Sequence, residues 1–136
     1  MNRRALFALA PIAGVALAAA ALPALASEGE GGGAPKDAFI RFPALTATII
    51  RPDGRRGVMT VEVGINVEDA EVRTQAALDM PRLRAAYNIV AQQAAAALRP
   101  GEPPDLERMS HDLAAATYRV LRKRGAVVLL GTVMVN

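Results

Sequence analysis

The sequence contains no cysteine, no tryptophan, one histidine and only five aromatic side chains among its 136 residues. Without cysteine the chain has no disulfide, no thiolate metal ligand, no thiol nucleophile and no site for a lipoprotein anchor. The single histidine, His111, would leave a metal site to carboxylates alone, and the acidic residues do not recur at ligand spacing. We therefore expect no metal, no cofactor and a domain held together by packing.

The sequence also has little excess charge in its main part. The pI is about 9.9, but two of the 16 basic residues, Arg3 and Arg4, stand near the N-terminus, and the other 14 are balanced by 13 acidic residues. The remaining arginines are scattered, and the few aromatic side chains offer no platform on which bases could stack. These features argue against a nucleic-acid partner.

Residues 1–26 have the pattern of an export signal. A cationic start with Arg3-Arg4 precedes an uncharged run over 5–22, and small residues follow at Ala24 and Ala26. This order is typical of a secretory signal peptide, so we expect cleavage after Ala26, a mature start at Ser27 and a periplasmic location. An uncleaved signal anchor in the inner membrane is the alternative, because a run of about 18 residues approaches the length of a bilayer span.

The rest of the chain divides into a tether and one folded domain. Residues 27–36 are rich in glycine and lack an apolar anchor, which indicates a flexible tether. Residues 37–136 are numerous and apolar enough to bury one core, and they contain no internal repeat.

Two strands joined by a hairpin are expected first in this domain. Residues 39–51 alternate as a strand whose early part is an edge or a bulge at Pro43. Residues 52–57 form the hairpin loop, and the next residues alternate as a half-buried antiparallel strand. The apolar face of this second strand is Met59, Val61, Val63, Ile65 and Val67.

Three helices and a last strand are expected next. A short helix covers 70–78, a second is capped by Asp79 with Pro81 in its first turn, and a third is capped by Asp105 and stops at Gly125. The apolar stripe of the second helix is Leu83, Tyr87, Val90, Ala94 and Leu98, and that of the third is Leu106, Met109, Leu113, Ala116 and Val120.

The C-terminal residues 126–135 form an almost unbroken apolar run. Such a run predicts a strand that is buried on both faces in the middle of a sheet. The fold class is therefore α+β, a small antiparallel sheet in the order β-β-α-α-β with the helices on one face.

This order of elements resembles the FliL family of flagellar basal-body-associated proteins. The resemblance covers residues 39–136 and rests on the glycine-containing hairpin, on the acidic end of the second strand in Ile65-Asn-Val-Glu-Asp-Ala70, and on the helix start Pro81-Arg-Leu-Arg84. It implies a stomatin-like (SPFH-like) periplasmic domain that is not an enzyme. Such a domain would associate with the flagellar basal body and stator and would form homo-oligomers.

A catalytic interpretation of Ser110-His111-Asp112 is not favoured. Consecutive residues on a helix point about 100° apart, so these three cannot pass a proton in series. The sequence has no Gly-x-Ser-x-Gly elbow and no phosphate-binding glycine loop. We therefore predict no catalytic residues.

Three exposed segments are candidates for protein contact. They are the hairpin tip, the alanine-rich second helix and the basic end of the third helix, where a solvated surface is the alternative in each case. The residues concerned are Asp53, Gly54, Arg55, Arg56, Arg84, Gln92, Gln93, Arg119, Arg122, Lys123 and Arg124. A soluble periplasmic accessory or binding domain without a flagellar role is the alternative to the FliL-like function.

Overall fold

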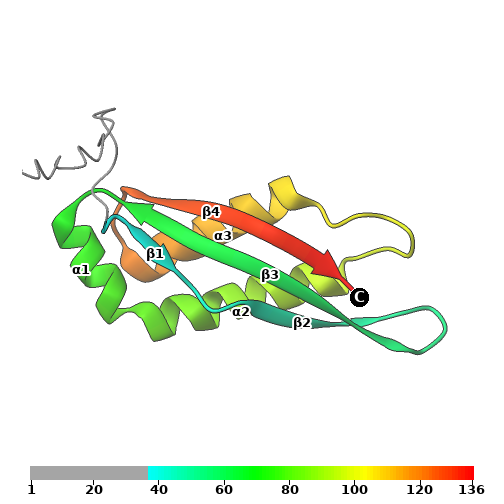
Figure 1. Cartoon of the computed structure of the whole chain (residues 1–136). Coiled ribbons are helices and arrows are strands. Elements are labelled where there is room, and N and C mark those ends of the chain that lie inside the picture. The colour runs from blue at the N-terminus through cyan, green and yellow to red at the C-terminus, as the bar shows by residue number, and fades with distance from the viewer. Residues whose placement is uncertain (1–36) are drawn as a thin grey trace, which may run out of the picture. The chain divides into compact units, whose positions relative to one another are not determined.

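A computed structural model describes residues 37–136, which form four strands and three helices (Figure 1). The predicted leader, its cleavage site and the tether, residues 1–36, lie outside the described residues. The elements are β1 (Phe39–Arg41), β2 (Leu45–Ile50), β3 (Arg56–Val67), α1 (Ala70–Leu78), α2 (Met80–Ala96), α3 (Leu106–Leu121) and β4 (Ala126–Val135).

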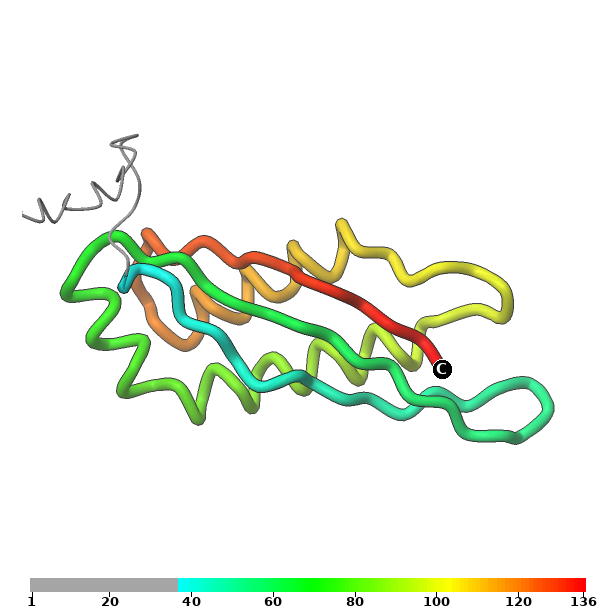
Figure 2. The backbone as a smooth tube through the Cα atoms, in the orientation of Figure 1, coloured from blue at the N-terminus to red at the C-terminus, as the bar shows by residue number. Residues whose placement is uncertain are grey.

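The strands form one antiparallel sheet with β3 at its centre (Figure 2). Both β1 and β2 pair with one side of β3, with Ile40 opposite Ile65 and Ala47 opposite Met59. Strand β4 pairs with the other side. The break between β1 and β2 falls at Pro43, because proline has no backbone N–H to donate to the ladder. The predicted edge or bulge at this residue is confirmed, because β1 and β2 lie at an edge of the sheet and their register against β3 shifts by one residue between Arg41–Gly64 and Leu45–Val61.

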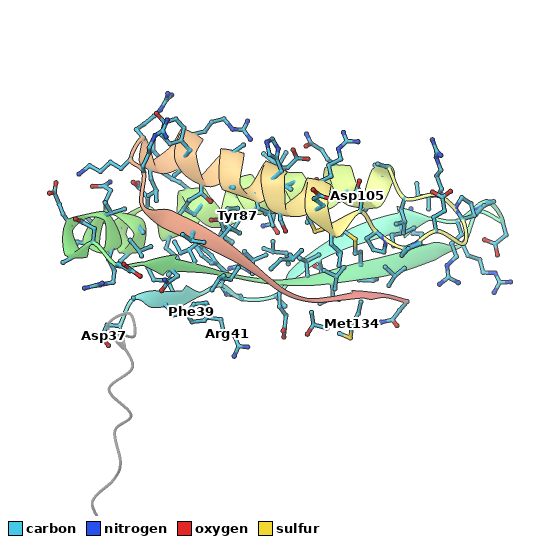
Figure 3. The ribbon with its side chains drawn as sticks, turned by 90° about the horizontal axis from the view of Figure 1, so that it is seen from above. Asp37, Phe39, Arg41, Tyr87, Asp105 and Met134 are labelled. Carbon is cyan, nitrogen blue, oxygen red and sulfur yellow. The ribbon has the colours of Figure 1, made fainter. Side chains whose placement is uncertain are left out.

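The helices form a second layer over one face of the sheet, with α2 lying on β2 and α3 beside β4 (Figure 3). Alternate residues of β2 and β3 are buried beneath them, as the period-2 pattern predicts. Fully buried side chains of both layers meet in one core, with Tyr87 between the layers. The largest of these side chains are Tyr87, Leu45, Met59, Ile65, Leu83, Met109 and Leu113.

The helix starts are only partly as predicted. The side chains of Asp69 and Asp105 accept hydrogen bonds from the backbone N–H groups of Val72 (2.9 Å) and Arg108 (3.0 Å), which makes both residues N-caps. Asp79 makes no such cap, because its carboxylate binds the side chains of Gln75 and Arg82 at the junction between α1 and α2.

Two details of the third helix differ from prediction. Leu106 is 48% exposed, because it lies in the first turn beyond the end of the core. The helix also ends at Leu121 rather than at Gly125, since Arg122 takes the left-handed conformation (φ 56°) and its N–H donates to the Tyr118 carbonyl. This is a C-cap in which a non-glycine residue carries the strain.

The prediction for the last strand is wrong in its position and its burial. Strand β4 lies at an edge of the sheet, and its residues alternate between half-buried and exposed. The register shifts where Val61 faces Val133 and Val63 faces Leu130, so that Gly131 and Thr132 together face Glu62. This β-bulge keeps both Leu130 and Val133 on the helix side of the sheet.

Candidate functional site

The face of the sheet turned away from the helices, called here the open face, is the largest concentration of exposed apolar side chains in the described residues. Figure 3 shows Phe39, Arg41 and Met134 pointing away from the helix layer. Among the exposed large apolar residues of the strands, those that alternate with buried neighbours belong to this face. They are Phe39, Ile50, Val58, Val127, Leu129 and Met134, each between 45% and 77% exposed.

The densest part of the open face is a row across β1, β3 and β4. Gly64 stands between Arg41 on β1 and Leu129 on β4, and the Phe39 ring lies over it. A Cβ placed on Gly64 would come within 2.4 Å of the ring, so the absence of a side chain is what lets Phe39 lie flat on β3. The adjacent pair, Asn66 and Val127, continues the row.

Polar side chains mark the rest of the open face. Arg41 and Glu62 are exposed on β1 and β3, and exposed or half-buried threonines follow on the neighbouring strands. These threonines are Thr46, Thr48 and Thr60. The open face is thus an apolar row bordered by hydroxyl groups and by three charged side chains, Arg41, Arg56 and Glu62, which suits a contact with another protein surface.

The predicted hairpin contact is an exposed tip that is ordered by its own side chains. The Asp53 carboxylate accepts a hydrogen bond from the Arg55 backbone N–H (3.0 Å) and pairs with the Arg55 guanidinium at 2.9 Å. Gly54 has φ +80°, which is the conformation that favours glycine in such a turn. Arg56 begins β3 and is also exposed.

The predicted basic cluster is divided by the fold. Lys123 pairs with Glu71 of α1 at 2.7 Å, so its charge is neutralised locally. Arg119 and Arg122 line a shallow hollow together with Arg82 of α2. Arg124 is exposed at the start of β4. Arg84 is exposed on α2 and does not line this hollow.

The alanine-rich segment of α2 serves mainly as an internal packing surface. Ala91 and Ala95 are buried in the core, while Gln92 and Gln93 are exposed. Gln93 also lines a groove of about 620 Å³ between the end of α2 and the start of α3, with charged residues on its α3 side. The predicted flat alanine face is therefore largely occupied within the domain.

The described residues contain no arrangement suited to proton relay or metal binding. His111 Nδ1 lies 3.6 Å from Asp112 Oδ1, and the imidazole is 84% exposed. No hydrogen bond connects Ser110 to His111 within the described domain. Residues 37–136 also hold no group of three or more His, Cys, Asp or Glu side chains that could bind a metal ion.

Tyr87 is the one buried phenol of the core. Its hydroxyl and that of Thr117 are 2.6 Å apart, and the Thr117 hydroxyl donates to the Leu113 carbonyl at 2.8 Å. Burial raises the pKa of Tyr87 above its ordinary value, although the hydrogen bond with Thr117 opposes the rise. Because this pair is fully enclosed and satisfied, it stabilises the core rather than forming a site.

A second hollow lies where the β2–β3 hairpin approaches the loop between α2 and α3. It has a volume of about 490 Å³ and is lined mainly by apolar side chains. These include Ile49, Ile50, Pro52, Leu98, Pro100 and Val135.

Sequence reasoning found the hairpin and the basic residues but missed the open face. The signal for the open face is that residues 126–130 are apolar at both odd and even positions, a pattern that also predicts burial on both faces of a strand.

No helix among the described residues is long and apolar enough to cross a membrane. No protein-family model matches the chain, and a search of curated proteins found no relative.

Proposed function

We propose that this protein is a non-catalytic periplasmic domain that associates with other proteins through the open face. The open face supports the proposal because apolar side chains from all four strands lie on one uncovered surface. Contiguous apolar patches rimmed by polar residues mark protein contact sites on soluble domains. Covering such side chains yields roughly 25 cal/mol per Å² of apolar surface removed from water, so burial is the source of free energy for the proposed association.

The element order, in which a glycine-containing hairpin precedes a proline-initiated helix, resembles FliL. We therefore propose a FliL-like, stomatin-type domain that contacts the flagellar basal body or stator and has its own copies as further partners. The leader at residues 1–26 would deliver it to the periplasm, either free after cleavage or tethered to the inner membrane.

The test is a charge placed on the open face of the protein in its native cell. Leu129→Lys and Met134→Lys each put a cation on an exposed apolar position, whereas Glu107→Lys puts one on the exposed side of α3 as a control. We expect the two open-face variants to reduce swimming speed as deletion of the protein does, with flagella still assembled and protein abundance unchanged.

Three outcomes of this test are informative. Normal swimming in the open-face variants would remove the open face as the functional surface. Normal swimming after deletion of the protein would remove the flagellar role and leave the second candidate. An equal defect in the Glu107→Lys control would show that charge anywhere on the domain is harmful, and this too would overturn the proposal.

The second candidate is a soluble periplasmic accessory or binding domain without a flagellar role. The apolar hollow beside the hairpin favours it, because a concave surface of about 490 Å³ is within the range of small-ligand sites. It differs from the first candidate in that deletion of the protein would leave swimming unaffected.

A further inference from the structure

Over residues 126–130, the outer edge of β4 carries a regular row of backbone groups that the sheet does not use. On the β1 side of β3, the Val63 carbonyl accepts from the Phe42 N–H and the Val67 N–H donates to the Ala38 carbonyl. On the β4 side, Val58 and Asn136 exchange two hydrogen bonds. Successive residues of a central antiparallel strand direct their backbone hydrogen bonds to the two neighbouring strands in turn. Gly64 therefore bonds to Leu129 of β4, and Asn66 bonds to Val127. The N–H and C=O groups of Ala126, Val128 and Leu130 therefore point outward from the sheet.

The two edges of the sheet are protected very differently. The β1–β2 edge consists of strands of three and six residues, broken at Pro43 and carrying Arg41. Strand β4 has ten residues with no charge and no proline, and its single irregularity is the bulge at Gly131 and Thr132. Soluble proteins normally blunt such an edge with charge, proline or a covering element. An edge strand without these features can form backbone hydrogen bonds with a strand of another chain.

We propose that the partner at this edge is a second copy of the same chain, whose β4 pairs antiparallel with the first about a two-fold axis at Val128. This inference rests on the proposed function, since it names one protein partner for the domain. The two sheets would become one continuous sheet, with the open-face rows of both copies side by side.

The register follows from the regular part of the strand. Centring on Val128 pairs Ala126 with Leu130 and Val127 with Leu129 of the second copy, which uses all of 126–130 and leaves both bulges outside the paired segment. Opposite residues in an antiparallel pair lie on the same face. The exposed Val127 and Leu129 therefore meet on the open face, and the half-buried residues meet on the helix side.

The flanks of the strand are also compatible with a second copy. Tyr118, which is 50% exposed, lines a shallow hollow at the start of β4 together with alanines and the basic residues Lys123 and Arg124, so this flank of the edge is open rather than covered. A two-fold axis makes every contact of this edge twice.

The first test is sedimentation of the full chain as recovered from the cell, in detergent if it is membrane-bound. The N–H of Val128 makes no bond within the sheet, so Val128→Pro removes a donor needed by the second copy while sparing the β3–β4 ladder. Val128→Ala trims the same side chain and keeps the N–H. We expect dimers for the wild type and Val128→Ala, and a dissociation constant at least about tenfold higher for Val128→Pro.

A second test keeps the inference falsifiable if Val128→Pro does not fold. Because the chain has no cysteine, single cysteines can be introduced without interference. Copies with Val127→Cys mixed with copies with Leu129→Cys should form the mixed disulfide faster than either forms its own. Non-hydrogen-bonded pairs place their Cα atoms about 4.5 Å apart, within disulfide reach. Thr48→Cys, at the opposite edge, should form no dimer.

The outcomes separate this inference from the proposed function. A monomeric wild type, a dimer unaffected by Val128→Pro, or no preference for the mixed disulfide would each overturn pairing at β4. If the open-face lysine variants still lost function in that case, the association function would stand with a different partner. If the β4 dimer formed and those variants functioned normally, the proposed function would fail instead.

Discussion

At the scale of single residues, the core of this domain depends on Tyr87 more than on any other polar side chain. Its ring meets Phe42 edge to face with centroids 5.0 Å apart, and its hydroxyl pairs with that of Thr117. A buried phenol contributes apolar area, aromatic contact and one hydrogen bond together. Its burial also raises the pKa of the phenol above its ordinary value.

Two measurements on Tyr87 follow from this environment. We expect Tyr87→Phe to lower the free energy of unfolding by about 1 kcal/mol in chemical denaturation, since one net hydrogen bond is lost while Thr117 keeps its bond to Leu113. The half-exposed Tyr118 provides the control, because Tyr118→Phe should change the stability of the monomer little. Equal losses in the two variants would contradict the assigned role of the buried hydroxyl.

The raised pKa of Tyr87 also predicts a pH dependence. Above pH 10.0, the ordinary pKa, the unfolded chain releases the proton while the folded protein retains it, so stability falls as the pH rises towards the folded-state value. This fall in stability should be absent from the Tyr87→Phe variant. Parallel alkaline profiles for the wild type and the variant, measured by denaturation at several pH values, would show that Tyr87 is not its source.

At the scale of elements, the helices differ in how well their ends are satisfied. Helices α1 and α3 begin with aspartate caps, whereas α3 ends on Arg122 in a left-handed conformation that glycine adopts more easily. The conformation reverses the chain towards β4, and thereby places α3 beside the strand that follows it.

Replacing this residue should stabilise the domain. We expect Arg122→Gly to raise the free energy of unfolding by about 0.5–1 kcal/mol, because removing the strained Cβ outweighs the entropy that glycine loses on folding. Arg119→Gly, inside the last turn of the same helix, removes a similar charge and should destabilise instead. Thermal melting of both variants shows whether each one is more or less stable than the wild type. A loss of stability in Arg122→Gly would mean that the Arg122 side chain contributes more to stability than its left-handed backbone costs.

At the scale of the whole molecule, one layer of helices covers one face of the sheet, and no element of the described domain covers the other face. The place where the domain acts depends on the predicted leader, which lies outside the described residues. Under the proposed function, an anchored domain would stay at the inner membrane, whereas a cleaved one would diffuse through the periplasm.

The intact mass of the protein from its native cell, combined with fractionation, tests the leader directly. Cleavage after Ala26 predicts a soluble species that begins at Ser27. A membrane-bound species that retains Met1 would contradict cleavage and would favour the tethered form of the FliL-like proposal.

Periodicity in the sequence by itself determined most of the local structure. The alternation in β2 and β3, the aspartates before α1 and α3 and the proline in α2 are local signals, because propensity and capping act within a few residues. They predicted the α+β class, the hairpin and the core residues of α2. The charged residues of the hairpin tip and of the end of α3 also predicted that these two segments are exposed.

Only the tertiary structure decided which strand is central and which face is open. An apolar run such as 126–135 has the same appearance whether it is buried on both sides or lies at an edge with a bulge, since strand order depends on pairing between distant residues. The contact between Phe39 and Gly64 likewise joins residues of different strands. The open face and the free edge of β4, on which both proposals rest, are properties of that arrangement.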